Sequence, residues 1–257
     1  GVFGLDDSVA GYFPEFAGIA DRPSGARPVT FRMLASHTAG LIREPQLPGA
    51  ASGPIYGWED KIIESIPTTR FQTAPATEYS YSNIGYGILG LASSRAAGVP
   101  FMDLVTDLIF SPLAMSSSMF IVNTPELAER LSVGYSLRRV RDQETGELIG
   151  SEVSAEQATR EHFGRGYKVP NGGIYSTVLD LAKFAAAMMG ESAVAILSDE
   201  SRAEMLEPQA PADGYGLGFM IRTGADGITT VGHGGSVAGY NAGLSFELDS
   251  KIGVAML

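Results

Sequence analysis

Hydrophobic residues in the middle of this chain recur with the spacing of an α-helix. Over 83–97, Ile84, Ile88 and Leu91 fall on one face, which predicts a helix there. Ser82 or Ser80 stands where a helix-capping side chain is preferred. We therefore expect an amphipathic helix that begins just after Ser82.

The same helix contains three glycines, at positions 85, 87 and 90. Glycine lowers helix propensity, so we expect another part of the chain to pack very close to this face. Similar patterns predict further helices after Thr30, over 58–65, over 101–110 with Leu104, Val105 and Leu108 inward, and from Thr177 to about Gly190.

Toward the end of the chain the spacing changes to that of strands. The pattern predicts four strands, over 215–222, 228–231, 241–248 and 252–257. Asp249-Ser250-Lys251 predicts a tight turn between the last two. The stretch 135–170 is polar and irregular and predicts a long excursion.

Helices in the middle and antiparallel strands at the end predict an α+β fold. We expect one domain over 1–257, with a mainly helical region at 30–200 and sheet strands at 214–257, so that an antiparallel sheet is flanked by helices. A buried apolar strand at 252–257 needs a neighbour to cover it. We therefore expect a fold that is incomplete at both ends, and a chain that folds poorly alone.

Composition excludes several classes of function. The net charge is −11, which disfavours nucleic acid and anionic membrane surfaces as partners. No apolar run approaches the ~20 residues of a transmembrane helix. The chain has no cysteine and three widely separated histidines, so we expect no metal site and no cofactor. A Gly-x-Gly-x-x-Gly match at 85–90 lies inside a predicted helix and does not indicate nucleotide binding.

One candidate for chemistry is Tyr81-Ser82-Asn83, at the predicted start of a helix. The positive end of a helix favours a phenolate at Tyr81, which could take a proton from a serine and return it to a leaving group. Asn83 could hold a substrate carbonyl. The alternative is a tyrosine that only packs, with its hydroxyl on a backbone partner.

A second candidate is His233-Gly234-Gly235-Ser236, expected where one strand ends. Glycines let the backbone approach a ligand closely, and the Ser236 N–H could be one oxyanion donor. His233 could place a donor or a charge beside a substrate. The alternative is a glycine-rich hairpin loop with a solvated histidine.

Taken together, four segments resemble a known family. They are Pro75 to Gly90, Asn171 to Ala182, Tyr215 to Phe219, and the His233 stretch, preceded by Ser36-His37-Thr38. In order and spacing they resemble the serine hydrolases that share a fold with class C β-lactamases and penicillin-binding proteins, a group that includes family VIII esterases and D-aminopeptidases.

The resemblance implies a role for each matched residue. Tyr81 would be the general base or its proton-relay partner, and Asn83 a contact of the substrate amide. His233 would stand where β-lactamases more often have a lysine. Gly234 and Gly235 would line the cleft, and the Ser236 N–H would complete the oxyanion hole. His37 is expected to be a buried hydrogen-bonding residue, and His162 to be exposed.

The chain departs from that family in one respect. The nucleophile motif Ser-x-x-Lys occurs nowhere in its 257 residues, and Ser136-Leu137-Arg138-Arg139 comes nearest. Ser82 and Ser236 are poor substitutes, because neither has a lysine or histidine at a convincing spacing. Either a missing N-terminal segment or chain carries the motif, or the protein has no nucleophile.

Two functions follow from these alternatives. The first is a serine hydrolase that opens an ester, amide or β-lactam of a small molecule or peptide through an acyl-enzyme, this chain alone being inactive. His233 in place of a lysine favours an esterase or a D-peptidase. The second is a non-catalytic binding or scaffold domain that keeps the cleft. The resemblance implies a periplasmic or extracellular location, with a cytoplasmic one also open.

Overall fold

The computed structural model describes residues 2–237 and 239–257, with side chains throughout except at 160 and 161. Its helices are α1 Phe31–Ala35, α2 Trp58–Ser65, α3 Asn83–Ala97, α4 Phe101–Val105, α5 Pro125–Glu129, α6 Glu156–Glu161, α7 Val169–Gly172, α8 Val178–Met189 and α9 Asp199–Met205. Its strands are β1 Ser136–Arg141, β2 Leu148–Ser154, β3 Met220–Thr223, β4 Thr229–Val237, β5 Tyr240–Glu247 and β6 Gly253–Met256. This is the α+β arrangement that the sequence predicts.

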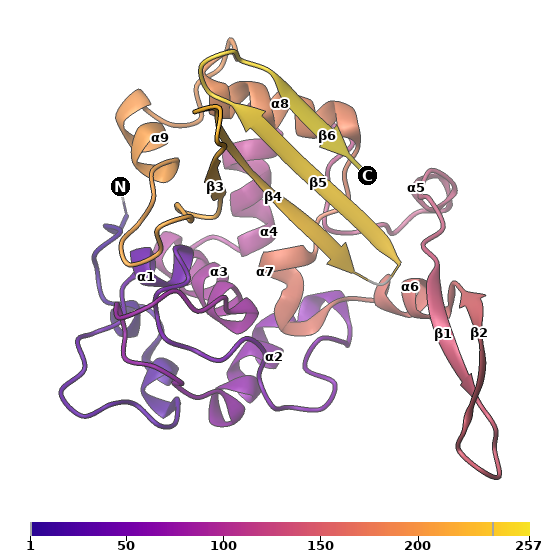
Figure 1. Cartoon of the computed structure of the whole chain (residues 1–257). Helices are drawn as coiled ribbons and strands as arrows, with labels where there is room; N and C mark the ends of the chain where they lie inside the picture. Colours follow the sequence, from indigo (N-terminus) through magenta and orange to yellow (C-terminus); the bar gives the residue numbers. More distant parts are fainter. Residues whose placement is uncertain (1, 238) are drawn as a thin grey trace.

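The main sheet is antiparallel, in the order β3-β4-β5-β6, and α8 packs against β5 and β6 (Figure 1). The contact buries apolar side chains from both sides, among them Met188 on α8, Val231 on β4 and Phe246 on β5. Thr177 caps α8 by accepting a hydrogen bond from the Asp180 N–H at 3.3 Å, as expected from the sequence. The sheet and α8 therefore share one small core.

A larger core lies among the helices, with α3 at its centre. Ile84, Ile88 and Leu91 are fully buried, which confirms the predicted face. A Cβ added at Gly87 would lie 2.8 Å from the Tyr167 carbonyl oxygen, and one at Gly90 would lie 2.4 Å from the Pro170 side chain. The glycines therefore let residues 167–170 rest directly on α3, the close approach that their presence predicts.

The predicted helix at 101–110 is present, but the side chains expected to face inward are only partly correct. After α4 the chain winds into a wider π-helical turn over Thr106–Phe110. That turn rotates the following residues relative to an α-helix. Leu108, expected inward, is 59% exposed, while Phe110 is buried instead.

The excursion at 135–170 is more regular than expected. It begins with an antiparallel hairpin, β1 and β2, in which Ser136 pairs with Ser154 (Figure 1). Most residues of both strands are exposed. Without a buried face the hairpin has no alternation of apolar and polar residues, so its sequence does not reveal it.

The glycine-rich segment at 232–236 is also placed differently. It belongs to β4, which runs on to Val237 and pairs with β5 throughout, from Thr230 opposite Glu247 to Val237 opposite Tyr240. The prediction of a loop after 231 is therefore wrong. Cross-strand pairing with β5 overrides the weak strand preference of three glycines.

Within residues 2–237 and 239–257, no single helix is long and apolar enough to cross a bilayer. One pair of helical segments, Asn83–Ala97 and Phe101–Phe110, is long and apolar enough when taken together, but the two are bent by 85° relative to each other.

Candidate active site

The backbone on both sides of Tyr81 is fixed by the turn that follows α1. The Ser80 N–H donates to the His37 carbonyl oxygen at 2.7 Å, and the Ser82 N–H donates to His37 Nδ1 at 3.1 Å. The Ser82 hydroxyl donates to the Ile42 carbonyl oxygen at 2.7 Å and also caps α3 by accepting from the Gly85 N–H at 3.0 Å. Tyr81 is therefore held at a defined position just before α3.

His37 is a buried histidine, as expected, and it supports the phenol of Tyr81. The two rings lie 4.0 Å apart between centroids. Burial, with the charges of His233 and Arg43 as smaller causes, lowers the pKa of His37 to about 3. The ring is neutral at ordinary pH, and because Nδ1 accepts from Ser82, its proton is on Nε2.

Tyr81 and His233 face each other across the gap between the helices and the sheet. Their ring centroids are 6.1 Å apart. Tyr81 precedes α3 and His233 lies on β4, so each layer contributes one of the two groups. They are 152 positions apart in the sequence, and the fold brings them together, as one shared site in the family resemblance implies.

The expectation of a phenolate at Tyr81 is wrong for the folded chain. Burial raises the pKa of Tyr81, Arg43 lowers it, and Glu44 raises it further. The Arg43 guanidinium lies 5.0 Å from the centre of the phenol ring. Desolvation outweighs this cation, so the hydroxyl keeps its proton.

His233 has a defined tautomer. Its Nδ1 lies 2.6 Å from the Gly234 carbonyl oxygen. A carbonyl can only accept, so Nδ1 carries a hydrogen and donates it. In the neutral ring, Nε2 then has a lone pair and can accept a proton.

The edge of β4 beside His233 carries no strand within the described residues. β3 pairs with β4 only as far as Met220 opposite Gly232. The Ile221 N–H donates to the Gly214 carbonyl oxygen, so the backbone groups of Ile221 point away from β4. Successive residues of a strand point their backbone groups to opposite edges, so those of Met220 point toward β4. Gly232, opposite Met220, therefore points its N–H and carbonyl toward β3. Every second residue of β4 does the same, so Gly234 and Ser236 point theirs toward this edge too, beyond the end of β3.

Asn83 is tied into a polar network beside the site. Its Nδ2 donates to Glu44 Oε1 at 2.6 Å, and its Oδ1 accepts from Asn171 Nδ2 at 3.2 Å. Lys168 Nζ lies 3.3 Å from the same Glu44 carboxylate. The Asn83 amide therefore already has protein partners, and Asn171 separates it from the cavity described next.

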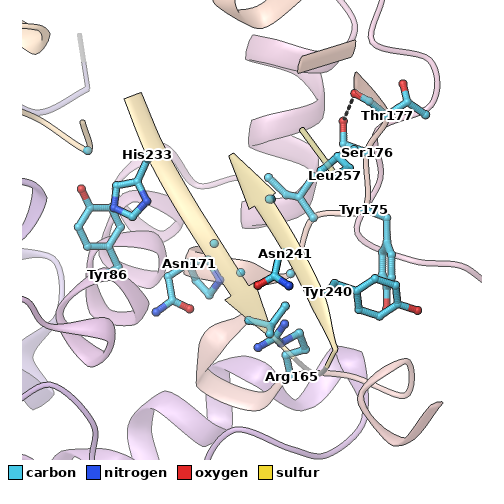
Figure 2. Close-up of a pocket in the computed structure, with 18 of the residues that line it drawn as sticks. Tyr86, Arg165, Asn171, Tyr175, Ser176, Thr177, His233, Tyr240, Asn241 and Leu257 are labelled. Carbon is cyan, nitrogen blue, oxygen red and sulfur yellow. Dashed lines mark hydrogen bonds between the residues drawn. The ribbon is translucent and has the colours of Figure 1, made fainter. Parts of the chain in front are cut away.

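A cavity of about 770 Å³ lies between the sheet and the segment that contains α7. Of the predicted site residues, Tyr81, His233 and Gly235 line it; Asn83, Gly234 and Ser236 are not among its lining residues. Figure 2 shows His233 with Tyr86 at one end and Arg165 with Tyr240 and Asn241 at another.

Several lining residues were not predicted. Tyr86 and Tyr215 pack around His37, with ring centroids 4.8 and 4.9 Å from it. Arg165 and Tyr240 come from segments without a recognisable motif. For Tyr86 and Tyr215 a signal existed, since both lie inside the family-like segments; for Arg165 none did.

The described residues contain no group of three or more His, Cys, Asp or Glu side chains placed to hold a metal ion.

Comparison with known proteins assigns the chain to a family. The sequence profile of the Beta-lactamase family matches residues 1–257. The chain belongs to this family.

Relatives and solved structures agree with that assignment. The chain is 29% identical to "Beta-lactamase-like protein 2" of Dictyostelium discoideum over 97% of its own length and 43% of that protein. It is 24% identical to "D-alanyl-D-alanine-carboxypeptidase/endopeptidase AmpH" of Escherichia coli K12 over 94% of its length and 61% of the relative. It superposes on the octameric penicillin-binding protein homologue from Pyrococcus abyssi with a TM-score of 0.69 and 26% identity, over 99% of this chain and 56% of that one. The chain thus spans less than two thirds of each of these proteins.

Proposed function

We propose that this chain forms part of the active site of a serine hydrolase that works through an acyl-enzyme. The observation that carries the proposal is the Tyr81–His233 pair, whose ring centroids lie 6.1 Å apart in the lining of a cavity, beside a strand edge that no described strand covers. Family membership supports the hydrolase class.

In this proposal Tyr81 and His233 pass a proton. The buried phenol keeps its hydrogen, so Tyr81 acts best as a relay that gives a proton to one group while taking one from another. His233 Nε2 is the neighbouring acceptor, because Nδ1 is engaged with Gly234. The lone pair of an imidazole nitrogen can accept a proton, whereas a lysine ammonium can only donate.

The β4 edge supplies the second element of catalysis. The Ser236 N–H, directed toward the open edge, is proposed as an oxyanion donor for the carbonyl under attack. Gly234 and Gly235 have no side chains to obstruct a substrate there; a Cβ at either position would meet only atoms of Ala242, at 3.6 and 3.8 Å. Asn83 is proposed to act on the substrate amide through Asn171, which lies between Asn83 and the cavity.

The nucleophile is proposed to come from a Ser-x-x-Lys segment outside these 257 residues. One side of the cavity supports this proposal, because Ile174, Val178 and Leu257 line it and are 47%, 44% and 60% exposed. Large apolar side chains in a cavity favour an apolar partner such as one face of a helix. The segment would place its serine between Tyr81 and the Ser236 N–H.

The substrate is proposed to be an ester or a D-amino-acid peptide rather than a β-lactam, because His233 replaces the lysine that the resemblance associates with lactamases. A periplasmic or extracellular location is proposed on the same resemblance. To test this preference, the protein expressed from its complete gene should hydrolyse short-chain p-nitrophenyl esters or D-alanyl peptides faster than a chromogenic cephalosporin. Fast cephalosporin turnover with negligible esterase activity would contradict it.

Covalent labelling tests the mechanism. A fluorophosphonate should add its mass to the protein expressed from the complete gene, at the serine of a Ser-x-x-Lys motif, and should leave the 257-residue chain unlabelled. Labelling of the 257-residue chain would mean that it contains its own nucleophile. If neither form is labelled, the alternative of a non-catalytic binding or scaffold domain is favoured instead.

A further inference from the structure

The β1–β2 hairpin projects from the rest of the molecule (Figure 1) and, within the described residues, forms a sheet of its own. Nearly all of its residues are exposed. A hairpin of two strands is only marginally stable in water unless further strands or a helix cover it. We propose that the outer edge of β2 pairs with the same edge of a second copy of this chain, so that two hairpins form one four-stranded antiparallel sheet.

The direction of the backbone groups of β2 follows from a hydrogen bond at the end of the hairpin. The Asp142 N–H donates to the Glu147 carbonyl oxygen at 2.8 Å, so the backbone groups of Asp142 point across the hairpin. Every second residue of a strand does the same, so those of Val140 point toward its partner Gly150 on β2, and those of Gly150 toward β1. The next residue, Ser151, therefore points its N–H and carbonyl to the outer edge, where another strand can bind them.

The two edges of the hairpin differ in charge. β1 carries three arginines, and antiparallel pairing with its own copy about the middle of the strand places Arg138 or Arg139 opposite itself. Like charges directly opposite each other destabilise a sheet, and charges on an edge strand oppose pairing. β2 carries one charge, that of Glu152, which forms an ion pair with Arg138 inside the hairpin. The β2 edge is therefore the one open to another strand.

β2 is complementary to its own copy in the antiparallel direction. Ser151 is the central residue of a strand of seven, so a twofold axis at Ser151 pairs the whole strand with the second copy. The two Ser151 residues then exchange both of their backbone hydrogen bonds. Glu152 lies opposite Gly150 of the second copy, so no like charges meet, whereas an axis at Glu152 would place two carboxylates opposite each other.

The same register covers apolar side chains. Leu137, Ile149 and Val153 are largely exposed in the single chain. Leu137 lies opposite Val153 within the hairpin, and the axis at Ser151 brings Ile149 of the second copy to the other side of Val153. Removal of apolar surface from water is the main favourable term in most protein association. The pairing uses only the hairpin and leaves the body of each copy unchanged.

A cysteine on the proposed axis tests the pairing, because the 257 residues contain none. In the protein expressed from its complete gene, with any other cysteine replaced by serine, Ser151→Cys should give a disulfide-linked dimer on a non-reducing gel after mild oxidation. Opposite residues of paired strands lie about 5 Å apart, within reach of a disulfide. Glu144→Cys, at the exposed hairpin tip, is the matched control. The two tips lie at opposite ends of the proposed sheet, more than about 20 Å apart, and should not crosslink.

Charge variants at the same position test the register. Ser151→Asp places two carboxylates opposite each other across the axis, while Arg139 still faces position 151 within the hairpin. Sedimentation velocity at several concentrations should give a dimer Kd about fivefold higher or more than that of Ser151→Asn, the neutral control of the same shape. The difference should shrink at high salt. An equimolar mixture of Ser151→Asp and Ser151→Lys should pair more tightly than either variant alone.

The outcomes decide the proposal without reference to hydrolysis, so the proposed function is tested separately. A protein that stays monomeric at every concentration, and crosslinks no faster at position 151 than at position 144, overturns it. Equal Kd values for Ser151→Asp and Ser151→Asn also overturn it, because another surface then forms the dimer. If a maleimide modifies the thiol at position 151 of a monomeric protein much more slowly than the thiol at position 144, a segment of the same chain covers β2 and the second copy is ruled out.

Discussion

At the scale of single residues, the buried His37 and the partly exposed His233 have opposite tautomers. His37 accepts through Nδ1 and carries its proton on Nε2, whereas His233 donates through Nδ1. The difference follows from their partners, a backbone N–H for one and a carbonyl for the other. One histidine packs against Tyr81, and the other is the one proposed to exchange a proton with it.

The role of Tyr81 predicts the effect of removing its hydroxyl. Tyr81→Phe keeps the ring that packs on His37, so the melting temperature should stay within a few degrees of the wild-type value. If Tyr81 relays protons, kcat should fall by about 10²-fold or more. Tyr79→Phe is the control, because Tyr79 is a neighbouring tyrosine outside the cavity lining and should retain activity.

The low pKa of His37 predicts a dependence of stability on pH. The pKa is about 3 in the folded chain against 6.5 as the ordinary value. The unfolded chain therefore takes up the proton first, so the stability that His37 contributes is complete above pH 6.5 and declines as the pH falls toward 3. The loss from this group is at most about 1.4 kcal/mol per pH unit.

Comparison with a variant isolates that contribution. His37→Asn keeps a residue type that tolerates the φ of +58° found at this position. Its unfolding free energy at pH 7 should be lower by about 1–3 kcal/mol, since a buried hydrogen bond is disturbed. Between pH 6.5 and 4 it should fall less steeply than that of the wild type in urea titrations; parallel curves would contradict the assignment.

At the scale of elements, the helix ends were the most predictable part of the structure. The sequence offers Ser82 or Ser80 as the cap of α3 and Thr177 as the cap of α8; Ser82 and Thr177 accept the capping hydrogen bonds. Capping is local chemistry, determined by residues three positions apart. The phase of 101–110 was not predictable in the same way, because a π-helical turn leaves no distinct pattern in the sequence.

Strand β4 shows what sequence alone does not reveal. Glycines in a row suggest a loop, yet here they continue a strand whose partner, β5, pairs with it as far as Tyr240. Pairing between strands is decided by the partner rather than by local preference. The sequence therefore pointed to Tyr81, His233 and Gly235, which line the cavity, but not to the strand edge that gives Ser236 its proposed role.

That strand edge can be tested with a backbone change. Ser236→Pro removes the N–H proposed to bind the oxyanion, while the ladder with β5 does not use that group. Activity should fall by about 10²-fold, the usual cost of one oxyanion donor. Ser236→Ala keeps the N–H and should stay near the wild-type rate. Equal losses in the two variants would point to the hydroxyl instead.

At the scale of the whole molecule, the described residues form two apolar cores, one among the helices and one between α8 and the sheet. The proposed catalytic groups come from both sides: Tyr81 precedes α3, and His233 is on β4. The α+β class was predictable because helical and strand periodicities occupy separate stretches of the sequence. The place of Arg165 in the cavity was not, because it depends on which residues the fold brings beside it.

The β1–β2 hairpin extends from this body and should be dispensable for folding (Figure 1). It exposes Leu137, Ile149 and Val153, at 73%, 64% and 67%. Replacing 139–151 with a two-residue Asn-Gly turn should change the unfolding free energy by less than about 1 kcal/mol, the range of surface changes. Chemical denaturation measures this, and a loss of several kcal/mol would show that the hairpin supports the core.

Because the proposed site is shared between two layers, a bound ligand should hold those layers together. A molecule that contacts both the Tyr81 phenol beside α3 and the backbone of β4 connects the helices to the sheet. Tight-binding inhibitors should then slow amide hydrogen exchange in both the helical layer and the sheet, including in segments that do not contact the inhibitor. The helical side and the sheet side would respond together, as one unit.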